Sequence, residues 1–365
     1  MKNYDVVIVG AGTAGLMLAR ELGKLKHKTL ILDRKSNLLE FSFNTLGSFM
    51  KIEDFGLSEN VIAQKIDTAV MHSKSFKHYI KGNTFILDKK LVHEELLNAL
   101  DDEYITIQLN TLIKKINKNT DGKYTSIEDS KGNSFEAKIF VDASGTSGVI
   151  SKEEGLREKN VELGPGVEYN VQYLGKPNEA HLFFGKEFKG GYGWIFPLKN
   201  QRAIIGFGTV NQNMFKNLKN TLNEIIESPR VKKLVVKDNN LVEGGSLPIT
   251  PVLTKFVKEN LVCVGDSVSQ VNPIVGEGYK FIFEAAIMAS KAISKSLHTG
   301  SLDGLFDYEK VWEKRFLANY ERSKIAQQRM VKLTNSDFLS DLAMLILLKL
   351  RPNHKNVNSL SGEYQ

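Results

Sequence analysis

The start of the chain contains the feature that most restricts its fold, a buried strand that runs into a glycine-rich turn and then a helix. Residues 4–9 read Y-D-V-V-I-V, an apolar run typical of a parallel strand covered on both faces. The turn G-A-G-T-A-G over residues 10–15 follows directly and opens a helical pattern. A second strand over 29–32 ends at Asp33, 18 residues beyond Gly15. This β-α-β arrangement predicts a Rossmann-like unit that binds a dinucleotide.

Each glycine of the turn has a distinct physical task. The first permits the tight turn, the second lets the backbone approach a pyrophosphate, and the third lets the helix pack closely on the strand. The N-terminus of the helix offers unpaired N–H groups and a positive dipole to the phosphates. Asp33 is suited to accept hydrogen bonds from ribose hydroxyls. A glycine turn in an ordinary α/β protein, the alternative, would not need an acid at this distance.

A second glycine turn lies far along the chain, where Val264-Gly265-Asp266-Ser267 ends a strand and N-P-I-V-G-E-G leads into another helical pattern. This order resembles the second flavin motif of the glutathione-reductase-type fold, in which the Asp holds pyrophosphate or ribityl oxygens. The resemblance implies that FAD, and not NAD, is the tightly held ligand. A third turn, Asp142-Ala143-Ser144-Gly145, resembles the A-[ST]-G turn that reaches the cofactor in the same fold. A helix cap at Asp266 and a plain strand-ending turn at 142–145 are the alternatives.

The expected cofactor-binding residues are therefore spread over three parts of the chain. They are Gly10, Ala11, Gly12, Thr13, Ala14, Gly15, Asp33, Arg34, Ala143, Gly145, Gly265, Asp266, Pro273, Gly276 and Gly278. Only one G-x-G-x-x-G is present, so NAD(P)H, if it is used, has no Rossmann domain of its own. The external reductant of FAD is left open between NAD(P)H, ferredoxin and another donor.

An aromatic segment lies between these glycine turns, where residues 190–208 read G-G-Y-G-W-I-F-P-L-K-N-Q-R-A-I-I-G-F-G. Its order relative to the other motifs resembles the signature of the geranylgeranyl reductase family, within the p-hydroxybenzoate-hydroxylase-like flavoproteins. Members of that family reduce isolated C=C bonds of isoprenoid chains with reduced FAD. The resemblance implies a hydrophobic isoprenoid substrate, such as a geranylgeranyl chain on a lipid or a diphosphate, and hydride transfer from flavin N5.

The same resemblance implies roles for individual residues of the segment. Tyr192 and Trp194 are the expected catalytic residues, and the expected substrate-binding residues are Phe196, Pro197, Gly206 and Gly208. The aromatic residues and Pro197 would face the flavin and the alkene, and the glycines would let the strand pass close. Aromatic rings shape an apolar tunnel and stabilise positive charge on a protonating alkene. For the proton donor, Tyr192 is a candidate by position, and water in the pocket is another. Without the flanking motifs, a packed sheet face would explain these aromatics equally well.

The chain departs from the family pattern at three places. Many members have a cysteine after the second strand, whereas residues 38–50 contain none. An arginine is usual where this chain has Lys89 and Lys90, and a lysine presents a point charge in place of a planar fork. Another usual arginine is missing after the Ala-Ser-Gly turn. These differences leave the precise substrate open.

Several other functions stay open at this stage. A flavin-dependent monooxygenase or halogenase of the same superfamily is one alternative, although halogenases carry Trp-x-Trp-x-Ile-Pro where this chain has Tyr192 and Phe196. A halogenase would also need a catalytic lysine, for which Lys74, Lys77 and Lys81 are candidates. A lycopene-cyclase-like flavoprotein without net redox change is another alternative. A flavin-binding protein that has lost its active site, and serves as a sensor or partner, belongs to a different class.

Composition limits the remaining function classes. The net charge is +7, but the basic residues are scattered and accompany no nucleic-acid motif, so we expect solubility and a weak attraction to anionic lipids or phosphorylated substrates. The single cysteine, Cys263, fits a reducing cytoplasm and a buried strand position. His72 and His78 lack metal-ligand spacing, so we expect no metal site.

The chain shows no secretory leader and no membrane-spanning run, so we expect a cytoplasmic protein. Residues 338–350 are apolar nearly all round the helical pattern and precede Arg351. They fit a buried C-terminal helix, a lipid tunnel or a helix that dips into a membrane surface. Peripheral contact with the inner face of the membrane and the oligomeric state are left open.

The predicted fold is α/β, with a Rossmann-like FAD-binding domain of the glutathione-reductase type, an inserted antiparallel sheet and a helical C-terminus. The FAD domain is expected from residues 1–60, 88–160 and 255–300, the antiparallel-sheet substrate domain from 61–87 and 161–254, and the C-terminal helical region from 301–365. Further strands are expected over 104–109, 111–117, 124–128, 134–141, 166–174, 180–185, 191–196 and 202–210, and helices over 91–100, 213–227, 276–297 and 304–350. Residues 36–60 are expected to be irregular, and the tail 353–365 to be frayed.

Overall fold

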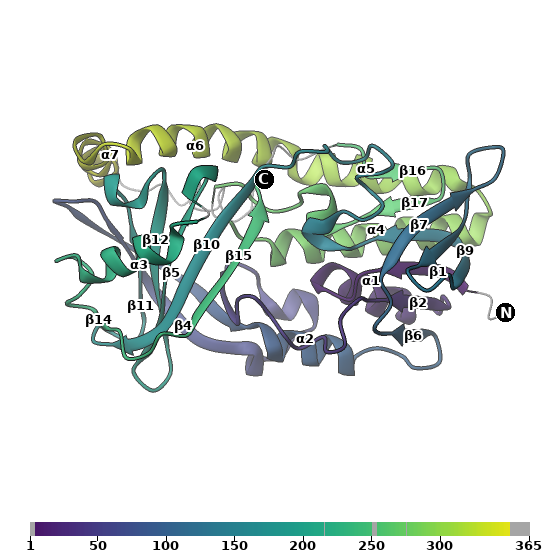
Figure 1. The fold of residues 1–365 in the computed structure, drawn as a ribbon, viewed down its shortest axis with the longest axis horizontal. Helices are drawn as coiled ribbons and strands as arrows, with labels where there is room; N and C mark the ends of the chain where they lie inside the picture. Colours follow the sequence, from purple (N-terminus) through teal and green to yellow (C-terminus); the bar gives the residue numbers. More distant parts are fainter. Residues whose placement is uncertain (1–3, 215, 250–253, 275, 351–365) are drawn as a thin grey trace.

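The computed structural model describes residues 4–214, 216–249, 254–274 and 276–350. The chain forms two halves, each built around one large sheet, with the first sheet on the right of Figure 1 and the second on the left. The last long helices run along the top of both halves. The chain crosses between the two sheets several times, so each sheet contains strands that are distant in the sequence.

The first sheet has a parallel centre in the order β17-β9-β1-β2-β6. Its parallel strands are β1 (Tyr4–Val9), β2 (Thr29–Leu32), β6 (Ile105–Gln108), β9 (Ser134–Asp142) and β17 (Leu261–Cys263). The short β16 (Val257–Lys258) pairs antiparallel with β17, and the hairpin of β7 (Ile113–Lys118) and β8 (Tyr124–Asp129) extends from β9. Helices α1 (Thr13–Lys24) and α4 (Tyr279–Thr299) pack against each other and share the core of this sheet. Val6, Val7 and Ile8 of β1 are fully buried, as expected for a strand covered on both faces.

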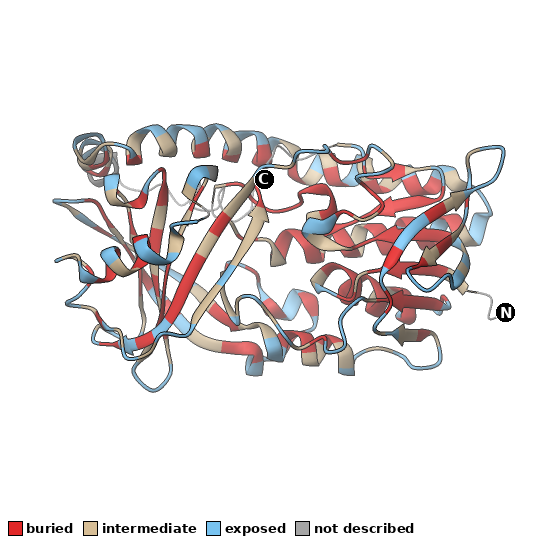
Figure 2. Cartoon of the chain, viewed as in Figure 1, coloured by how far each residue is buried: buried red, intermediate tan, exposed pale blue. Residues whose placement is uncertain are grey.

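The second sheet is almost entirely antiparallel, in the order β14-β10-β13-β12-β11-β4-β5-β3, with β15 also paired to β10. Its strands are β3 (Thr45–Ser48), β4 (Ile62–His72), β5 (Lys77–Asp88), β10 (Leu163–Tyr173), β11 (Glu179–Phe183), β12 (Gly191–Leu198), β13 (Arg202–Thr209), β14 (Val235–Val236) and β15 (Val242–Pro248). The exception is β11, which runs parallel to β4. Helix α3 (Leu218–Glu227) contributes to the core on one face of the sheet, where Tyr169 and Phe207 are buried. Figure 2 shows buried and partly exposed residues alternating along β10, because successive side chains point to opposite faces.

The remaining helices connect the sheets and cover their edges. They are α2 (Lys89–Asn98), α5 (Asp307–Trp312), α6 (Ala318–Thr334) and α7 (Asp337–Leu350), and a π-helical turn (Glu313–Leu317) joins α5 to α6 without a break. Short 3-10 turns cover Ile52–Phe55, Glu59–Val61, Gly145–Ser147, Lys186–Phe188, Gln212–Met214, Gly265–Val268 and Leu302–Phe306. The rings of Trp312, Phe316 and Tyr320 contact one another along this long helix, and those of Phe316 and Tyr320 pack against Phe281 of α4. The aromatic cluster therefore fixes the C-terminal helices to the first half of the molecule.

The predicted α/β class and most predicted elements are confirmed, and Cys263 is buried in a strand as expected. The prediction that residues 36–60 are irregular was wrong at β3, which pairs with β5 at the edge of the second sheet. Strand β15 was missed because V-E-G-G-S-L-P contains two glycines and a proline, which are depleted in strands. The helix expected from residue 213 begins at Leu218. The expected tail lies outside the described residues, and the domain boundaries stay a prediction.

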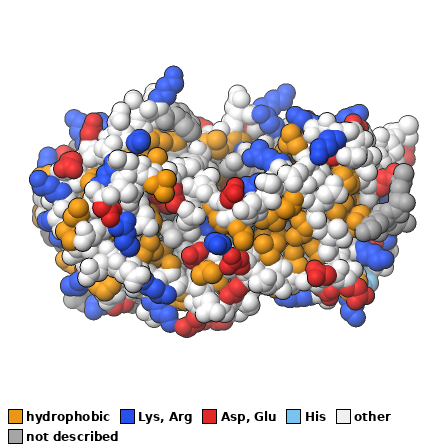
Figure 3. Space-filling model, turned by 60° about the horizontal axis from the view of Figure 1, so that its bottom comes forward, with side chains coloured by type: hydrophobic (Ala, Val, Ile, Leu, Met, Phe, Trp, Pro, Cys, Tyr) orange, Lys and Arg blue, Asp and Glu red, His pale blue; other side chains and the backbone are white. Residues whose placement is uncertain are grey.

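Charged side chains are distributed over the surface as the sequence suggested. On the face shown in Figure 3, Lys and Arg are interspersed with Asp and Glu, and hydrophobic side chains gather between them in the right half of the view. Within the described residues, none of the helices has the length and apolar character needed to span a bilayer. Residues 338–346 of α7 are only partly buried, because Met344 is 3% exposed whereas Phe338 is 73% exposed and Ile346 is 48% exposed.

The packing of the first glycine turn leads to a test of stability. A Cβ added at Gly15 would lie 1.9 Å from the Gly10 carbonyl oxygen, so Gly15→Ala should lower the free energy of unfolding by about 1–3 kcal/mol, as overpacking does. Gly12→Ala is the matched control, because a Cβ at Gly12 meets no atom within 4 Å. Urea denaturation of both variants without added cofactor measures the difference. Equal stability of the two variants would contradict the close contact of α1 with the turn.

Candidate functional site

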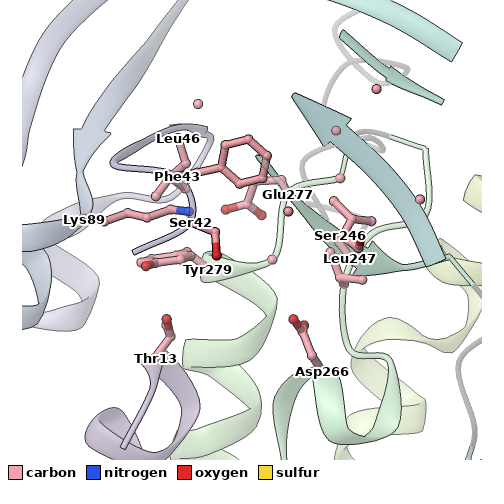
Figure 4. Close-up of a pocket in the computed structure, with 18 of the residues that line it drawn as sticks. Thr13, Ser42, Phe43, Leu46, Lys89, Ser246, Leu247, Asp266, Glu277 and Tyr279 are labelled. Atoms are coloured by element: carbon pink, nitrogen blue, oxygen red, sulfur yellow. The ribbon is translucent and has the colours of Figure 1, made fainter. Parts of the chain in front are cut away.

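A cavity of about 520 Å³ contains residues from both sheets and from the helix ends near them. It brings together most of the residues predicted from the sequence, although these lie up to 267 residues apart, as Ala11 and Gly278 show. The predicted residues that line it are Ala11, Gly12, Thr13, Asp33, Tyr192, Trp194, Phe196, Gly208, Asp266, Pro273, Gly276 and Gly278. Figure 4 shows Thr13 and Asp266 at one end of this cavity and Lys89, Phe43 and Glu277 farther along it. The two sheets therefore share one site.

The end of the cavity near α1 has the properties of a phosphate site. The Gly12 N-cap makes no side-chain hydrogen bond, so the first N–H groups of α1 face the cavity without a side-chain cap. The space beside Gly12 is empty to 4 Å. Asp33 lines the same end, where its Oδ2 accepts a hydrogen bond from the Ala11 amide at 2.7 Å and its Oδ1 accepts one from Lys35 at 2.8 Å. The Asp33 carboxylate thereby fixes the glycine turn, and it retains acceptor capacity toward the cavity.

The second glycine turn places Asp266 opposite this helix end. Gly265 has a positive φ of 80°, and its amide donates to Gln270 Oε1 at 2.7 Å, which fixes the turn. Burial raises the pKa of Asp266 to about 6, against the lowering effects of Arg157 and Lys89. A buried carboxyl at this position can accept a hydrogen bond from a ligand hydroxyl. The arrangement thus fits a dinucleotide at this end, with phosphates at the α1 N-terminus and hydroxyl groups near Asp33 and Asp266.

Several predicted residues support the site from outside the cavity. Gly10, Ala14, Gly15, Arg34, Ala143, Gly145, Gly265, Pro197 and Gly206 are not among the residues that line it. The 143–145 turn packs behind the first glycine turn, where a Cβ on Gly10 would lie 2.4 Å from the Ala143 carbonyl oxygen. Asp142 fixes this turn by accepting hydrogen bonds from the amides of Ser144 and Ile150 at 2.9 Å each. Asp142 also accepts from the Ser144 hydroxyl at 2.6 Å, so its observed contacts are with groups of the protein itself.

Successive side chains of β12 point to opposite faces of the sheet, and this alternation places its aromatic residues toward the cavity. Tyr192, Trp194 and Phe196 are partly exposed and line the cavity, whereas Ile195 and Pro197 are buried on the other face. The expectation that Pro197 faces the cavity with the aromatic residues was therefore wrong, because adjacent strand residues point in opposite directions. Ring centroids of Tyr192 and Trp194 are 5.7 Å apart, and those of Trp194 and Phe196 are 6.2 Å apart. The three rings form a continuous apolar wall.

The sequence suggested that Gly206 lets the strand pass close to the flavin and the alkene, but in the structure its neighbour is the Trp194 indole. Gly206 is paired with Trp194 across β12 and β13, and a Cβ on Gly206 would lie 2.2 Å from the Trp194 indole. A Cβ on Gly208 would lie 3.3 Å from the same ring. The missing side chain at Gly206 therefore provides the space in which the indole lies flat across the sheet. This position of the ring brings its Nε1 to within 3.3 Å of Glu168 Oε2 on the next strand.

A row of three glycines lies beside this indole. Gly208, Gly166 and Gly245 pair in register across β13, β10 and β15, in line with Tyr192 of β12. All four residues line the cavity, and aromatic rings lie against the glycines, because a Cβ on Gly166 would be 3.6 Å from the Phe43 ring and 3.7 Å from the Trp194 ring. The Phe43 ring covers the far end, because a Cβ on Gly245 would lie 2.8 Å from it. The row and its aromatic borders form an elongated apolar surface suited to a flexible hydrocarbon chain.

Several ionisable residues of the cavity were not in the predicted site, among them Glu168, Glu277 and Lys89. Burial raises the pKa of Glu168 to about 8 and that of Glu277 to about 7, and burial lowers the pKa of Lys89. Glu277 Oε1 accepts from Ser48 Oγ at 2.9 Å and from the Lys280 amide at 3.1 Å. Sequence offered a signal for two of them, since Glu277 lies inside G-E-G and Lys89 replaces a usual arginine, whereas Glu168 occupies an ordinary polar position of the alternating strand V-E-Y-N-V-Q-Y. Their common location could not be deduced from these signals alone.

Metal ligands do not cluster in the part of the chain that the structure describes. No group of three or more His, Cys, Asp or Glu side chains there could hold an ion. His72 and His181 are in contact, with 3.0 Å between Nε2 and Nδ1, and Tyr173 OH lies 2.9 Å from His181 Nε2. Burial lowers the pKa of His72 to about 3 and that of His181 to about 4, so both rings are neutral at physiological pH.

Comparisons with known proteins agree with this geometry. The sequence model of the family described as lycopene cyclase protein matches residues 5–356. The chain belongs to this family. A digeranylgeranylglycerophospholipid reductase of Methanocaldococcus jannaschii is 27% identical over 366 residues, which cover 93% of this chain and 90% of the relative. Digeranylgeranylglycerophospholipid reductase 3 of Methanosphaera stadtmanae is 27% identical over 316 residues, covering 81% of this chain and 79% of the relative.

A solved structure shows the same fold. A geranylgeranyl bacteriochlorophyll reductase-like protein of Thermoplasma acidophilum matches with a TM-score of 0.83 and 21% identity, over 94% of this chain and 91% of that one. The resemblance predicted from the glycine turns and the aromatic strand is therefore confirmed. The predicted site residues themselves are placed by the structure, and their roles stay predictions.

The contact between Gly206 and the indole can be tested directly. Gly206→Ala should displace the Trp194 ring, lower the free energy of unfolding by about 1–3 kcal/mol and change the Trp194 fluorescence. Gly208→Ala is the control, because its nearest indole atom lies 3.3 Å away and a small shift accommodates the methyl group. Urea denaturation and emission spectra measure both effects. If Gly206→Ala behaved like Gly208→Ala, the indole would not occupy this space.

Proposed function

We propose that this chain binds FAD in the shared cavity and reduces C=C bonds of an isoprenoid chain, such as a geranylgeranyl chain on a lipid or a diphosphate. The observation that carries the proposal is that the aromatic wall of β12 and the glycine turn of α1 line one cavity. The relatives support it, because two of them are named digeranylgeranylglycerophospholipid reductase and align over most of the chain. Bound FAD in its reduced form would supply a hydride at N5.

The residues of the chain would provide binding, orientation and a dry environment. The α1 N-terminus and Gly12 would hold the pyrophosphate, and Asp33 and Asp266 would accept hydrogen bonds from ribose and ribityl hydroxyls. Tyr192, Trp194 and Phe196 would align the alkene and exclude water, which keeps the reacting atoms in a near-attack geometry. The π face of Trp194 would also stabilise positive charge that develops on the alkene.

The glycine row would accept the hydrocarbon chain. Gly208, Gly166 and Gly245 line the cavity beside Tyr192, and the rings of Trp194 and Phe43 lie against them. A prenyl chain on this surface would pass directly beside the indole of Trp194. Movement of the chain along this apolar surface would bring successive double bonds to the same reacting position. The electron donor that would reduce FAD is not part of this proposal.

A second candidate function is cyclisation of an isoprenoid without net redox change. The match of the lycopene cyclase family to residues 5–356 favours it specifically. Both reactions would use a bound flavin and an apolar cavity in which an alkene is protonated, so the same cavity could serve either. They differ in the mass of the product, because reduction adds two hydrogens to each double bond and cyclisation adds none.

The experiment that distinguishes reduction from cyclisation measures the mass of the product. The purified protein, loaded with FAD and reduced anaerobically with dithionite, is mixed with geranylgeranyl diphosphate, a geranylgeranylated lipid or lycopene. We expect a gain of two mass units per double bond together with flavin reoxidation. An isomer of unchanged mass would support the cyclase, and reoxidation by oxygen alone, with all three substrates unchanged, would favour a monooxygenase or halogenase.

A variant at the pyrophosphate position provides the control for cofactor binding. Gly12→Ala should leave the stability of the cofactor-free protein unchanged, because the methyl group meets no atom within 4 Å. It should still weaken FAD binding, since the methyl group occupies the space that the pyrophosphate would need. Fluorescence titration with FAD measures the loss. Unchanged affinity would argue against a pyrophosphate at this helix end.

We also propose that α7 contacts a lipid surface. Phe338, Leu342 and Ile346 are exposed by 73%, 44% and 48%, and large apolar side chains exposed on one helix favour an interfacial position. A lipid substrate could then enter the cavity from the membrane.

Phe338→Ser with Leu342→Ser should reduce sedimentation with vesicles of anionic phospholipid, whereas Ile325→Ser on the neighbouring α6 should have a smaller effect. Equal sedimentation of all variants would contradict this proposal.

A further inference from the structure

Glu168 is a buried carboxyl placed at the aromatic wall of the cavity. It lies on β10, lines the cavity and is only 4% exposed. Its Oε2 accepts a hydrogen bond from Trp194 Nε1 at 3.3 Å. Its Oε1 is buried and has no hydrogen-bond partner among the residues that the structure describes. A buried polar oxygen without a protein partner is rare and calls for a ligand, a water molecule or a chemical role.

The position of Glu168 follows from the register of the sheet. Trp194, Gly206, Glu168 and Glu243 form one row across β12, β13, β10 and β15. Residues of such a row share a face, so the carboxyl and the indole are on the same face of the sheet. Gly206 separates them without a side chain, which lets the indole reach the carboxyl. The contact between acid and aromatic ring therefore depends on that glycine.

We propose that Glu168 is the acid that delivers a proton to the alkene beside Trp194. This inference rests on the proposed reduction of an isoprenoid double bond. In the balanced step, the O–H bond of Glu168 breaks and the π electrons of the alkene form the new C–H bond. The other alkene carbon accepts a hydride from reduced flavin, which is thereby oxidised by two electrons. Water then returns a proton to the carboxylate before the next turnover.

The surroundings of Glu168 suit an acid that is protonated before the reaction and ionised after it. Burial raises the pKa of the carboxyl to about 8, and Glu243 of β15 acts in the same direction, so the acid form predominates at neutral pH. Lys89, at the start of α2, lowers the pKa of Glu168 and would stabilise the carboxylate once the proton has left. Trp194 Nε1 donates to the same group from β12. An acid whose pKa lies close to the working pH is an efficient proton donor.

Glu168 is better suited to this role than the other acids of the cavity. Burial raises the pKa of Tyr192 to about 12, so its hydroxyl is a much weaker acid. Glu277 has a pKa of about 7, and its Oε2 is likewise buried without a partner among the described residues, but its Oε1 is engaged by Ser48 and by the Lys280 amide at the start of α4. Glu168 is the carboxyl that contacts the aromatic wall directly.

The first experiment measures the ionisation of Glu168 without cofactor or substrate. The chain has two tryptophans, so Trp312→Phe leaves Trp194 as the single indole. Phe is a mild replacement there, because Trp312 lies among aromatic rings and its Nε1 has no hydrogen-bond partner within the described residues. We expect the Trp194 emission to change with pH around a midpoint near 8, because the carboxyl that accepts from the indole loses its proton. Adding Glu168→Gln should abolish this transition.

Two further variants identify the residue whose ionisation causes the change in Trp194 emission. Glu243→Gln should shift the midpoint to lower pH, because a neighbouring negative charge is removed, and Lys89→Gln should shift it to higher pH. If the transition survived in Glu168→Gln but disappeared in Lys89→Gln, it would belong to the lysine. That result, or the absence of any transition between pH 6 and 10, would overturn the proposal.

The second experiment measures the reaction with FAD and the prenyl substrate. Glu168→Gln is an isosteric mimic of the protonated acid, so it should fold, bind FAD and be reduced by dithionite like the wild type. We expect its rate of prenyl reduction in a single turnover to fall about 100-fold or more, as for loss of a general acid. The wild-type rate should decrease above pH 8, where Glu168 loses its proton, and the residual rate of the variant should lose this dependence.

The outcomes separate this inference from the proposed function. A wild type that leaves every prenyl substrate unchanged would refute the reductase. A wild type that reduces the substrate, with a Glu168→Gln variant that reduces it at nearly the same rate, would refute the role of Glu168 alone. Loss of FAD binding in the variant would also overturn the assignment, because Glu168 would then serve the cofactor site.

Discussion

The structure depends on a close contact of three backbone segments at the first glycine turn. Gly10 approaches the Ala143 carbonyl, and Gly15 approaches the Gly10 carbonyl, at distances that exclude any side chain. This contact joins β1 and α1 to β9, which is distant from them in sequence, into one packed unit. Because α1 starts directly at the turn, the same contact fixes the free N–H groups of the helix at the cavity. The packing of the first sheet and the phosphate site thus share one constraint.

The second sheet uses glycine for a different purpose. Gly206 makes room for the Trp194 indole, and the row of Gly208, Gly166 and Gly245 leaves room for the rings of Trp194 and Phe43 over the sheet. A packed sheet face would fill these positions with side chains and close the cavity. The cost in strand stability is small for each glycine, and the long ladder of β10 with β13 offsets it. The sheet therefore acts as the wall of a binding site on one face and as a core on the other.

Electrostatics give the cavity two different ends. The end near α1 offers N–H groups, Asp33 and Asp266, which suits a dinucleotide. The end near β12 places Glu168 and Lys89 against aromatic rings, in surroundings that favour neutral forms. A charged carboxylate and an apolar alkene would not share this space, whereas a protonated carboxyl can. The burial that makes the wall apolar is thus also what makes the carboxyl an acid at neutral pH.

Particular residues show how far sequence reasoning reached. The turn at 10–15 was recognised because glycine spacing and a distant acid reflect local geometry, which the chain encodes directly. The aromatic strand was recognised, but Pro197 was assigned to the cavity because the side-chain alternation had not been applied to it. Strand β3 was missed because its pairing with β5 is a property of two segments and of neither alone.

The sequence by itself determined the α/β class, the two glycine turns, the aromatic strand and the family, because each depends on the spacing of residues that are close together along the chain. Only the tertiary structure decided that Glu168 meets Trp194 and that three glycines align into a floor. Those facts depend on the register between strands up to 79 residues apart, as for Gly166 and Gly245. Register is set by the pairing of whole strands and the packing of their faces, so no short motif can carry it.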